Sequence, residues 1–237
     1  MEDQMSKGID YFNRGHWLTD IHERVSVATR KRMFKIAVRK LGLKAGQTMV
    51  DFGTTPDVER QDSNCMIPWF ADLGMSVALA SPEDITHLAT VFSFARILPA
   101  TGFHHPIAAG VREFDLVTSS AVLEHCGDRT HQITHIKECA RVADRIFLTT
   151  PNRWHWLEFH TKIPLMHWLP QSMHRGCLDI AGLHFWAKEE NLNLLSLRQL
   201  KELADEALRN EFEYQIQTVW TLGMPSNFIL LAYRLLW

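Results

Sequence analysis

Two residues at the end of an apolar run, one acidic and one a glycine, suit cofactor binding. The run begins at Met49, contains Asp51, and stops at Gly53 and a turn. A strand that ends in this way brings backbone N–H groups and a carboxylate to the carboxyl edge of a parallel sheet, where open α/β folds bind nucleotides. A charge at the end of a buried strand is hard to explain structurally. We therefore expect Asp51 and Gly53 to contact a nucleotide-type cofactor.

The residues that follow Asp51 and Gly53 are consistent with either of two roles. Thr54, Thr55 and Asp57 either line the cofactor or serve ordinary turn chemistry, since Thr-Pro-Asp also suits a helix entry. Ser119 and Ser120 follow a second apolar stretch that starts at Phe114, and their small side chains allow a ligand to come close. We expect both serines to lie beneath the reactive end of the cofactor.

Side chains suited to proton transfer follow in the second half of the chain. Glu124 and His125 act either as a helix cap and satisfied polar pair or directly in catalysis. Neutral imidazole titrates near working pH, so the histidines of segment 151–190 are candidate bases. We predict His160 as the base, with Glu158 on the same side of an extended segment two residues earlier. His167 is the second candidate, and an ordinary structural histidine is the alternative for each.

Acceptor-binding residues are expected directly after the strand at 145–150. Asn152 and Arg153 come first, and Arg153 suits a carboxylate or phosphate as well as a local salt bridge. Trp168 belongs to a group of four tryptophans that form either a stacking wall for an acceptor or the core of their own segment. With His167, these residues are the predicted substrate-binding set.

Histidine pairs elsewhere do not predict a metal site. His131 and His135 are one helical turn apart, and His104 and His105 are adjacent. Neither pair has cysteines or carboxylates at convincing ligand spacing, so we expect no metal.

The elements that must position these residues alternate between strand and helix. Expected helices cover 20–42, 63–73, a segment opened by Ser81 as N-cap and Pro82, 130–141 and 197–208. Expected strands cover 48–52, 76–80, 95–99, 114–119, 145–150, and a hairpin of 212–220 with 228–234. This alternation predicts an α/β fold with a Rossmann-like, doubly wound sheet, mostly parallel, with a C-terminal antiparallel hairpin at its edge.

Segment 151–190 breaks the alternation. It is rich in Trp, His and Pro and has no clean periodicity, so we expect a small lid insertion over the carboxyl edge. The chain then reads as one domain, 1–237. Its parts are an N-terminal helical segment at 1–44, a cofactor-binding core at 45–150, a lid and acceptor insertion at 151–195, and completion of the sheet at 196–237. The basic face of helix 20–42 is either solvated or a docking face for an anionic substrate or membrane surface.

Composition limits the function classes. With 237 residues, 46% hydrophobic residues and a net charge of −2, the chain can bury one substantial core and has no general electrostatic footprint for nucleic acid. Four scattered cysteines favour a reduced, cytoplasmic protein. The first residues are too acidic for a secretory signal, and the apolar run at 228–233 is too short to span a bilayer. The expected state is a monomer or homodimer.

These residues together resemble class I S-adenosylmethionine-dependent methyltransferases. The likeness is carried by the strand with Asp51-x-Gly53, by the stretch from Phe114 to His125, and by the closing hairpin. More narrowly, the chain is similar to bacterial proteins of the type 11 kind, mostly uncharacterised. That likeness rests on further short stretches at 55–57, 62–64, 120–125, 150–153, 158–161, 167–170, 190–193 and 225–227.

The resemblance implies S-adenosylmethionine as cofactor, S-adenosylhomocysteine as product, and methyl transfer to oxygen or nitrogen of a small-molecule or sugar acceptor. Two glycines of the usual turn are Thr55 and Asp57 here. The usual acid after the second strand aligns near Leu79 or Ala80, with Glu83, Asp84 or Asp57 as substitutes. The adenine-reading position aligns near Thr101, which we include among the cofactor-binding residues.

Two other functions fit parts of the pattern. A non-catalytic protein of methyltransferase fold, acting as a scaffold or regulatory partner, would explain the lost glycines and acids. A nicotinamide-dependent dehydrogenase would share the doubly wound sheet, but it needs a G-x-G-x-x-G turn where this chain has Gly53 alone. Cofactor affinity separates the first alternative from an enzyme.

Overall fold

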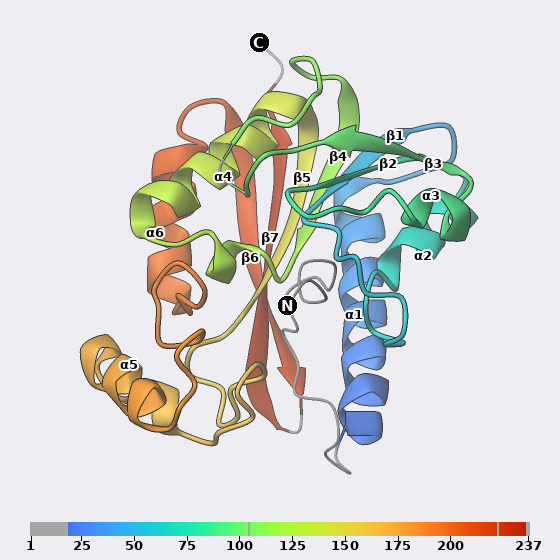
Figure 1. The fold of residues 1–237 in the computed structure, drawn as a ribbon. Helices are drawn as coiled ribbons and strands as arrows, with labels where there is room; N and C mark the ends of the chain where they lie inside the picture. The colour runs from blue at the N-terminus through green and yellow to red at the C-terminus, as the bar shows by residue number, and fades with distance from the viewer. Residues whose placement is uncertain (1–18, 104, 222, 236–237) are drawn as a thin grey trace.

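A seven-stranded sheet organises the molecule in the computed structural model, which describes residues 19–103, 105–221 and 223–235. The strand order is β3-β2-β1-β4-β5-β7-β6, and only β7 runs antiparallel to its neighbours (Figure 1). The strands are β1 (Thr48–Phe52), β2 (Ser76–Ser81), β3 (Ala95–Pro99), β4 (Phe114–Ser120), β5 (Ala143–Pro151), β6 (Phe212–Thr221) and β7 (Met224–Arg234). The predicted mostly parallel, Rossmann-like sheet with its C-terminal hairpin is confirmed.

Helices cover both faces of this sheet. One face packs against α4 (Arg129–Val142) and α6 (Leu197–Ala207), and the other against α1 (Thr19–Leu41) and α2 (Met66–Asp72) (Figure 1). Alternate residues of a strand point to opposite faces, so Val50 of β1 belongs to the first core and Met49 to the second. The expected helices at 20–42, 130–141 and 197–208 are confirmed to within one residue at each end.

The strand order reverses between β1 and β4. The chain builds outward from β1 through β2 to β3, then returns to place β4 on the other side of β1. At such a reversal the connections leave in opposite directions and open a crevice at the carboxyl ends of the strands. Asp51 of β1 lies in register with Thr118 of β4 at this point.

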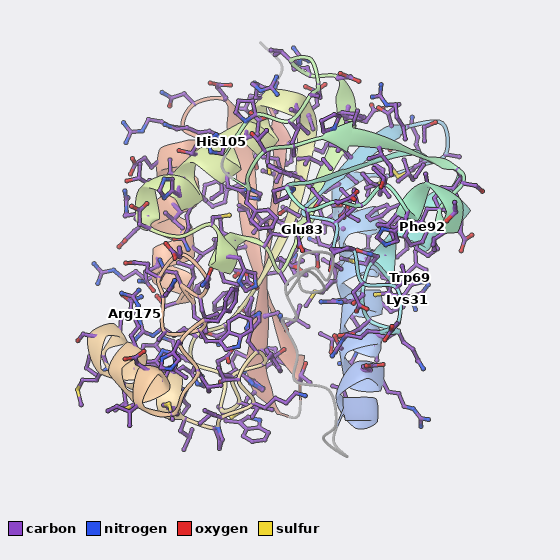
Figure 2. All side chains as sticks on the ribbon, viewed as in Figure 1. Lys31, Trp69, Glu83, Phe92, His105 and Arg175 are labelled. Atoms are coloured by element: carbon purple, nitrogen blue, oxygen red, sulfur yellow. The ribbon has the colours of Figure 1, made fainter. Side chains whose placement is uncertain are left out.

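The N-terminal helix is attached to the rest of the protein by part of its basic face. Arg30 makes an ion pair with Asp62 at 3.8 Å and donates a hydrogen bond to the Asp62 carbonyl. The Lys31 ammonium lies 4.3 Å from the ring centroid of Trp69, and Figure 2 shows these two side chains next to each other. Part of the basic face of α1 therefore contacts other residues of the chain, whereas Arg32 and Lys35 are exposed.

The segment after β5 forms a layer of its own beside the end of the sheet where β5 finishes (Figure 1). Its small core contains Leu178, Trp186, Leu192 and Leu194. It is less irregular than expected, because it contains a short 3₁₀ helix, Met166–Trp168, and an α-helix, α5 (Gln171–Ile180). Gly176 in the middle of α5 lowers the helix propensity of this segment.

A second expectation is also wrong. Ser81 and Pro82 do not begin a helix, because Ser81 is the last residue of β2. The Ser81 hydroxyl accepts a hydrogen bond from the backbone N–H of Glu83, which closes a turn, and the next helix, α3 (Leu88–Val91), starts later. The expected helix at 63–73 begins only at Met66 for a similar reason, since Asn64 has a φ of +55°.

Among the described residues, no helix combines the length and the apolar character needed to cross a bilayer.

We predict that Gly53→Ala destabilises the fold by about 1–3 kcal/mol. Gly53 has a φ of +106°, and a Cβ there would lie 2.3 Å from Cγ2 of Val122, so backbone strain and a clash act together. Gly176→Ala is the matched control, because it lies in a helix with nothing within 4 Å of the added methyl group. We expect the control to gain about 0.5–1 kcal/mol. Urea unfolding of the three proteins gives both values, and a neutral Gly53→Ala would show that the turn relaxes.

Candidate functional site

Asp51 is the carboxylate at the strand-order reversal, and it bridges two strands. Its Oδ1 accepts a hydrogen bond from the Thr118 hydroxyl at 2.6 Å, and its Oδ2 accepts one from the Thr54 hydroxyl at 2.8 Å. No ion pair to Asp51 is formed by the described residues. Burial raises the pKa of Asp51, against the two hydroxyls and the charge of Arg30, which act to lower it. Within residues 19–103, 105–221 and 223–235, the carboxylate therefore has no ion-pair partner at the place where a ligand is expected.

The turn after β1 is held by its own hydrogen bonds. Asn64 joins both sides of the turn, since its Oδ1 accepts from the Thr55 N–H and its Nδ2 donates to the Thr55 carbonyl. Asp57 accepts a hydrogen bond from the Ser63 hydroxyl at 2.6 Å. Thr54 is buried, and its hydroxyl is bonded to Asp51. Thr55 and Asp57 have turn partners, and contact of any of these three residues with a cofactor stays a prediction.

The other predicted cofactor residues lie on different faces. Ser119 is buried on the α4 face, where its hydroxyl lies 2.9 Å from Nε2 of His135. Ser120 lies 3.0 Å from the Thr149 hydroxyl on β5. Thr101 is exposed in the segment that follows β3. Thr118 is the residue that sequence reasoning missed, and its register opposite Asp51 needs the strand order to be known.

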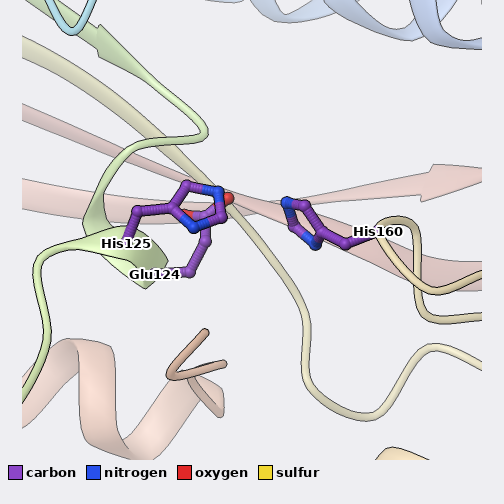
Figure 3. Close-up of side chains that lie close together, drawn as sticks. All are labelled: Glu124, His125 and His160. Atoms are coloured by element: carbon purple, nitrogen blue, oxygen red, sulfur yellow. The ribbon is translucent and has the colours of Figure 1, made fainter. Parts of the chain in front are cut away.

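Four titratable side chains lie close together at the carboxyl end of β4, the strand next to β1. They are Glu124, His125, Glu158 and His160. Glu124 and His125 lie on a short 3₁₀ helix, Leu123–His125, directly after β4, and His160 reaches them from the lid (Figure 3). The rings of His125 and His160 are edge to face, with centroids 4.7 Å apart. Glu158 holds His160 from behind, with its Oε1 2.6 Å from Nδ1 of the ring. The three residues predicted as catalytic, His125, Glu158 and His160, are therefore brought together by the fold.

Glu158 is the most fully bonded member of the cluster. Its Oε1 also accepts from the backbone N–H of His160, and its Oε2 accepts from the N–H and hydroxyl of Thr161. This is a turn and not the extended segment that we expected, because the carboxylate bonds the two following N–H groups. Glu158 contacts His160 and positions its ring.

Glu124 has the opposite environment. Its side chain is 0% exposed, its Oε2 accepts from the Thr150 hydroxyl at 3.0 Å, and its Oε1 has no hydrogen-bond partner. Burial raises its pKa to about 7, against the charge of His160, which lowers it. A carboxyl group with this pKa exchanges protons at neutral pH.

Burial acts on the two histidines with different results. Burial and the charge of His160 lower the pKa of His125 to about 3, so this ring is neutral. Burial also acts to lower the pKa of His160, but the charge and hydrogen bond of Glu158 outweigh it and raise the pKa. Burial also acts to raise the pKa of Glu158, but the charge of His160 and hydrogen bonds from its ring, its N–H and the Thr161 N–H outweigh burial, so that the pKa falls to about 2.

The predicted acceptor residues line the lid side of this edge. Arg153 and His167 both face a hollow of about 10 Å³, with His174 and Arg175 opposite them. Burial lowers the pKa of Arg153, and the neighbouring charge of Arg175 lowers it further. Nδ1 of His167 is buried without a hydrogen-bond partner. The hollow has room for about one water molecule. Because His167 donates its Nε2–H to the His155 carbonyl, its Nδ1 is an acceptor beside the donors of Arg153 and Arg175.

The remaining acceptor candidates divide between surface and frame. Trp168 and Trp154 are 40% and 47% exposed and form an edge-to-face pair, with the Arg153 guanidinium 5.2 Å from the Trp154 ring. Trp186 belongs instead to the lid core. The Asn152 side chain donates to the Pro225 carbonyl and accepts from the Trp154 N–H, so it joins the lid to β7.

The lid is attached to the cluster through residues 191–193. The Asn191 carbonyl lies 2.7 Å from Nδ1 of His125, and the Asn193 N–H donates to the Glu124 carbonyl at 2.7 Å. Neither Asn191 nor Asn193 caps the following helix, because Ser196 and Gln199 form the capping box there. The backbone of this segment therefore sets the orientation of His125.

Comparisons with known proteins place the fold. No protein-family model and no curated protein matches the chain. Among solved structures, a Rhodobacter sphaeroides protein provisionally named as a Zn-dependent alcohol dehydrogenase aligns with a TM-score of 0.62 at 10% identity, over 90% of this chain and 98% of its own. Magnesium protoporphyrin IX methyltransferase from Synechocystis PCC 6803, with bound S-adenosylhomocysteine, aligns with a TM-score of 0.57 at 15% identity, over 94% and 91%.

A third similar structure is 1,6-didemethyltoxoflavin-N1-methyltransferase from Burkholderia thailandensis, with its substrate and S-adenosylhomocysteine bound. It aligns with a TM-score of 0.55 at 12% identity, over 94% of this chain and 92% of its own. Identities this low show the fold alone. The fold is the one shared by class I S-adenosylmethionine-dependent methyltransferases, as the sequence resemblance implied.

We predict that Asp51→Asn raises the melting temperature at neutral pH. The pKa of Asp51 is higher in the folded chain than in the unfolded one, so the unfolded chain releases this proton first as pH rises from about 4. The free energy of unfolding falls through the interval between the two pKa values. An asparagine cannot ionise and can keep both hydroxyl contacts.

Melting curves of the wild type and Asp51→Asn between pH 4 and 8 measure this effect. The gain in melting temperature should grow with pH, and Asp72→Asn, at an exposed position, should show no such trend. A variant that is less stable than the wild type at pH 7 would mean that the Asp51 charge supports the fold.

Proposed function

We propose that this chain is an S-adenosylmethionine-dependent methyltransferase that acts on oxygen or nitrogen of a small-molecule or sugar acceptor. The observation that carries the proposal is the Asp51 carboxylate, which lacks an ion pair among the described residues and lies at the strand-order reversal of this sheet. The antiparallel β7 between β5 and β6 also separates the sheet from the six-stranded dinucleotide-binding order of dehydrogenases.

The charge of the cofactor matches this carboxylate. S-Adenosylmethionine carries a sulfonium and an α-ammonium group, and either cation near Asp51 would offset the desolvation that raises the pKa of its carboxyl group. Two lone-pair positions of the carboxylate are taken by Thr118 and Thr54, which leaves acceptor capacity for a ligand donor.

Of the three acids that the sequence left open, we assign the ribose contact to Glu83 because of its place in the sheet. Glu83 is half-buried directly after β2, the strand beside β1, and Figure 2 shows it near the centre of the molecule. A carboxylate at the end of β2 is well placed to bind ribose hydroxyls.

The cluster of Glu124, His125, Glu158 and His160 is the proposed acceptor side of the site. It lies at the carboxyl ends of β4 and β5, one strand from Asp51, so a cofactor at the reversal can present its methyl group toward it. The acceptor atom attacks the methyl carbon in line with sulfur, and a hydroxyl acceptor must also lose a proton. We assign His160, oriented by Glu158, as the residue that acts on this proton.

The exposed tryptophans and the hollow beside Arg153 indicate which kind of acceptor fits the site. Trp154 and Trp168 offer an aromatic surface for a sugar or planar ring, and Arg153 lies between this pair and the hollow. The Burkholderia protein has 1,6-didemethyltoxoflavin bound. An acceptor with a ring fits the aromatic surface of the present chain best.

We predict that the purified protein binds S-adenosylhomocysteine and that Asp51→Asn weakens binding at least tenfold. A hydrogen bond to a charged group contributes about 1.5–3 kcal/mol, which corresponds to a factor of about ten or more. Calorimetric titration measures both affinities, with Asp72→Asn as the control. If neither the wild type nor the variants bind at high micromolar ligand, the chain is a non-catalytic scaffold of this fold.

We predict that His160→Gln lowers turnover by about 10²–10⁴-fold while leaving S-adenosylhomocysteine affinity unchanged. The assay is release of S-adenosylhomocysteine with acceptors found by screening hydroxyl- and amine-bearing rings against the wild type. His184→Gln is the matched control, because His184 is exposed and pairs with Asp179 in the lid, outside the cluster. Unchanged turnover in His160→Gln would remove this residue from the reaction.

A further inference from the structure

The three side chains in Figure 3 converge from two segments far apart in the sequence. Glu124, His125 and His160 each offer one ligand atom, and these atoms all lie within 4.8 Å of one another. A point then exists within about 2.8 Å of all three, against metal–nitrogen distances of about 2.0–2.1 Å for zinc. Movements well below the length of a side chain would complete the coordination.

The carboxylate gives an independent reason to expect a cation. Oε1 of Glu124 is fully buried and has no hydrogen-bond partner among the described residues, while Oε2 accepts from the Thr150 hydroxyl. Leaving a buried acceptor unsatisfied lowers stability, and more so if the group is charged. An ion bound at the point where the three ligand atoms meet would remove this cost.

The contacts behind the ligands fix the orientation of both rings. His125 donates Nδ1–H to the Asn191 carbonyl, because a carbonyl only accepts, and its neutral ring then carries the lone pair on Nε2. His160 has Nδ1 against the Glu158 carboxylate. A carbonyl and a carboxylate on Nδ1 are the partners that hold metal-binding histidines in protein sites.

We propose that Glu124, His125 and His160 bind a divalent transition-metal ion of the zinc class. Two imidazole nitrogens and one carboxylate oxygen suit such ions, whereas calcium and magnesium prefer all-oxygen sites. Three protein ligands leave coordination positions for a water molecule or substrate. Sequence spacing did not predict this set, because Glu124 and His125 are adjacent and the third ligand lies in the lid.

The role of the ion rests on the proposed function, although its binding does not. A hydroxyl acceptor that coordinates the ion loses its proton to solvent more easily, because the ion stabilises the oxyanion. The oxygen electron pair then forms the bond to the methyl carbon, and the carbon–sulfur pair stays on sulfur as S-adenosylhomocysteine. In this case His160 would act on the acceptor only through the ion that it binds, and Glu158 keeps its ring in place.

Metal binding by the purified full-length chain tests the proposal directly. After treatment with a chelator and dialysis, we expect one equivalent of Zn²⁺ in a calorimetric titration and one of Co²⁺ with visible absorption bands of a low-coordinate site. Glu124→Gln and His160→Asn should each lower affinity at least tenfold. Glu158→Gln should lower it about 10–100-fold, as expected for a residue that supports a ligand.

Matched controls separate this site from the other histidines. His131→Asn and His184→Asn should bind like the wild type, since both residues are exposed and lie outside the cluster. Circular dichroism checks that every variant is folded, and Glu124→Gln keeps the shape of the side chain. Absence of stoichiometric binding at micromolar metal, or full binding by both Glu124→Gln and His160→Asn, would overturn the proposal.

Titration with S-adenosylhomocysteine distinguishes this inference from the proposed function. A chain that binds the nucleoside but no metal contradicts the metal site and leaves methyl transfer through His160 as base. A chain that binds the metal but not the nucleoside contradicts methyl transfer and leaves the metal site.

Discussion

The burial of carboxylates at one edge of the sheet is the constraint on which the site depends. Glu158 receives four hydrogen bonds and its pKa falls to about 2, so its charge is well stabilised. Asp51 receives two from hydroxyls and Glu124 receives one, and burial raises the pKa of both. Within the described part of the chain, the charge of Glu158 is therefore stabilised more fully than the charges of Asp51 and Glu124, which a bound cation can stabilise further. Buried charges that are incompletely stabilised lower stability and persist where a ligand uses them.

The cofactor half and the acceptor half of the site are held in place by different parts of the fold. Asp51 and Thr118 are fixed by the register of neighbouring strands, which is set by the core on both faces of the sheet. The position of His160 depends on the lid, which is joined to the sheet by Asn152 and by the backbone of 191–193. A rigid cofactor half and an acceptor half built on a separate small core allow acceptors to differ without changes in the sheet.

Sequence patterns predicted those elements of the fold that are determined by residues close together in the chain. The strand that contains Asp51 was predicted with its observed bounds, because an apolar run that ends in a glycine turn is a local signal. Glu158 and His160 were predicted to be neighbours, although by an extended segment, while the carboxylate in fact forms a turn with the next two N–H groups. Helix α5 was not predicted, and Gly176 in its middle lowers the helix propensity of that segment.

Long-range pairing accounts for what the sequence did not predict. Nothing in the residues 124–125 and 160 shows that they meet, since the contact depends on how the lid folds back over β4 and β5. The partner of Asp51 across the reversal has the same origin. A metal site is usually found in a sequence by regular spacing within one element. Here two ligands share one turn and the third lies in a loop, so the clearest sign is a buried carboxylate oxygen that has no partner, and that sign exists only in three dimensions.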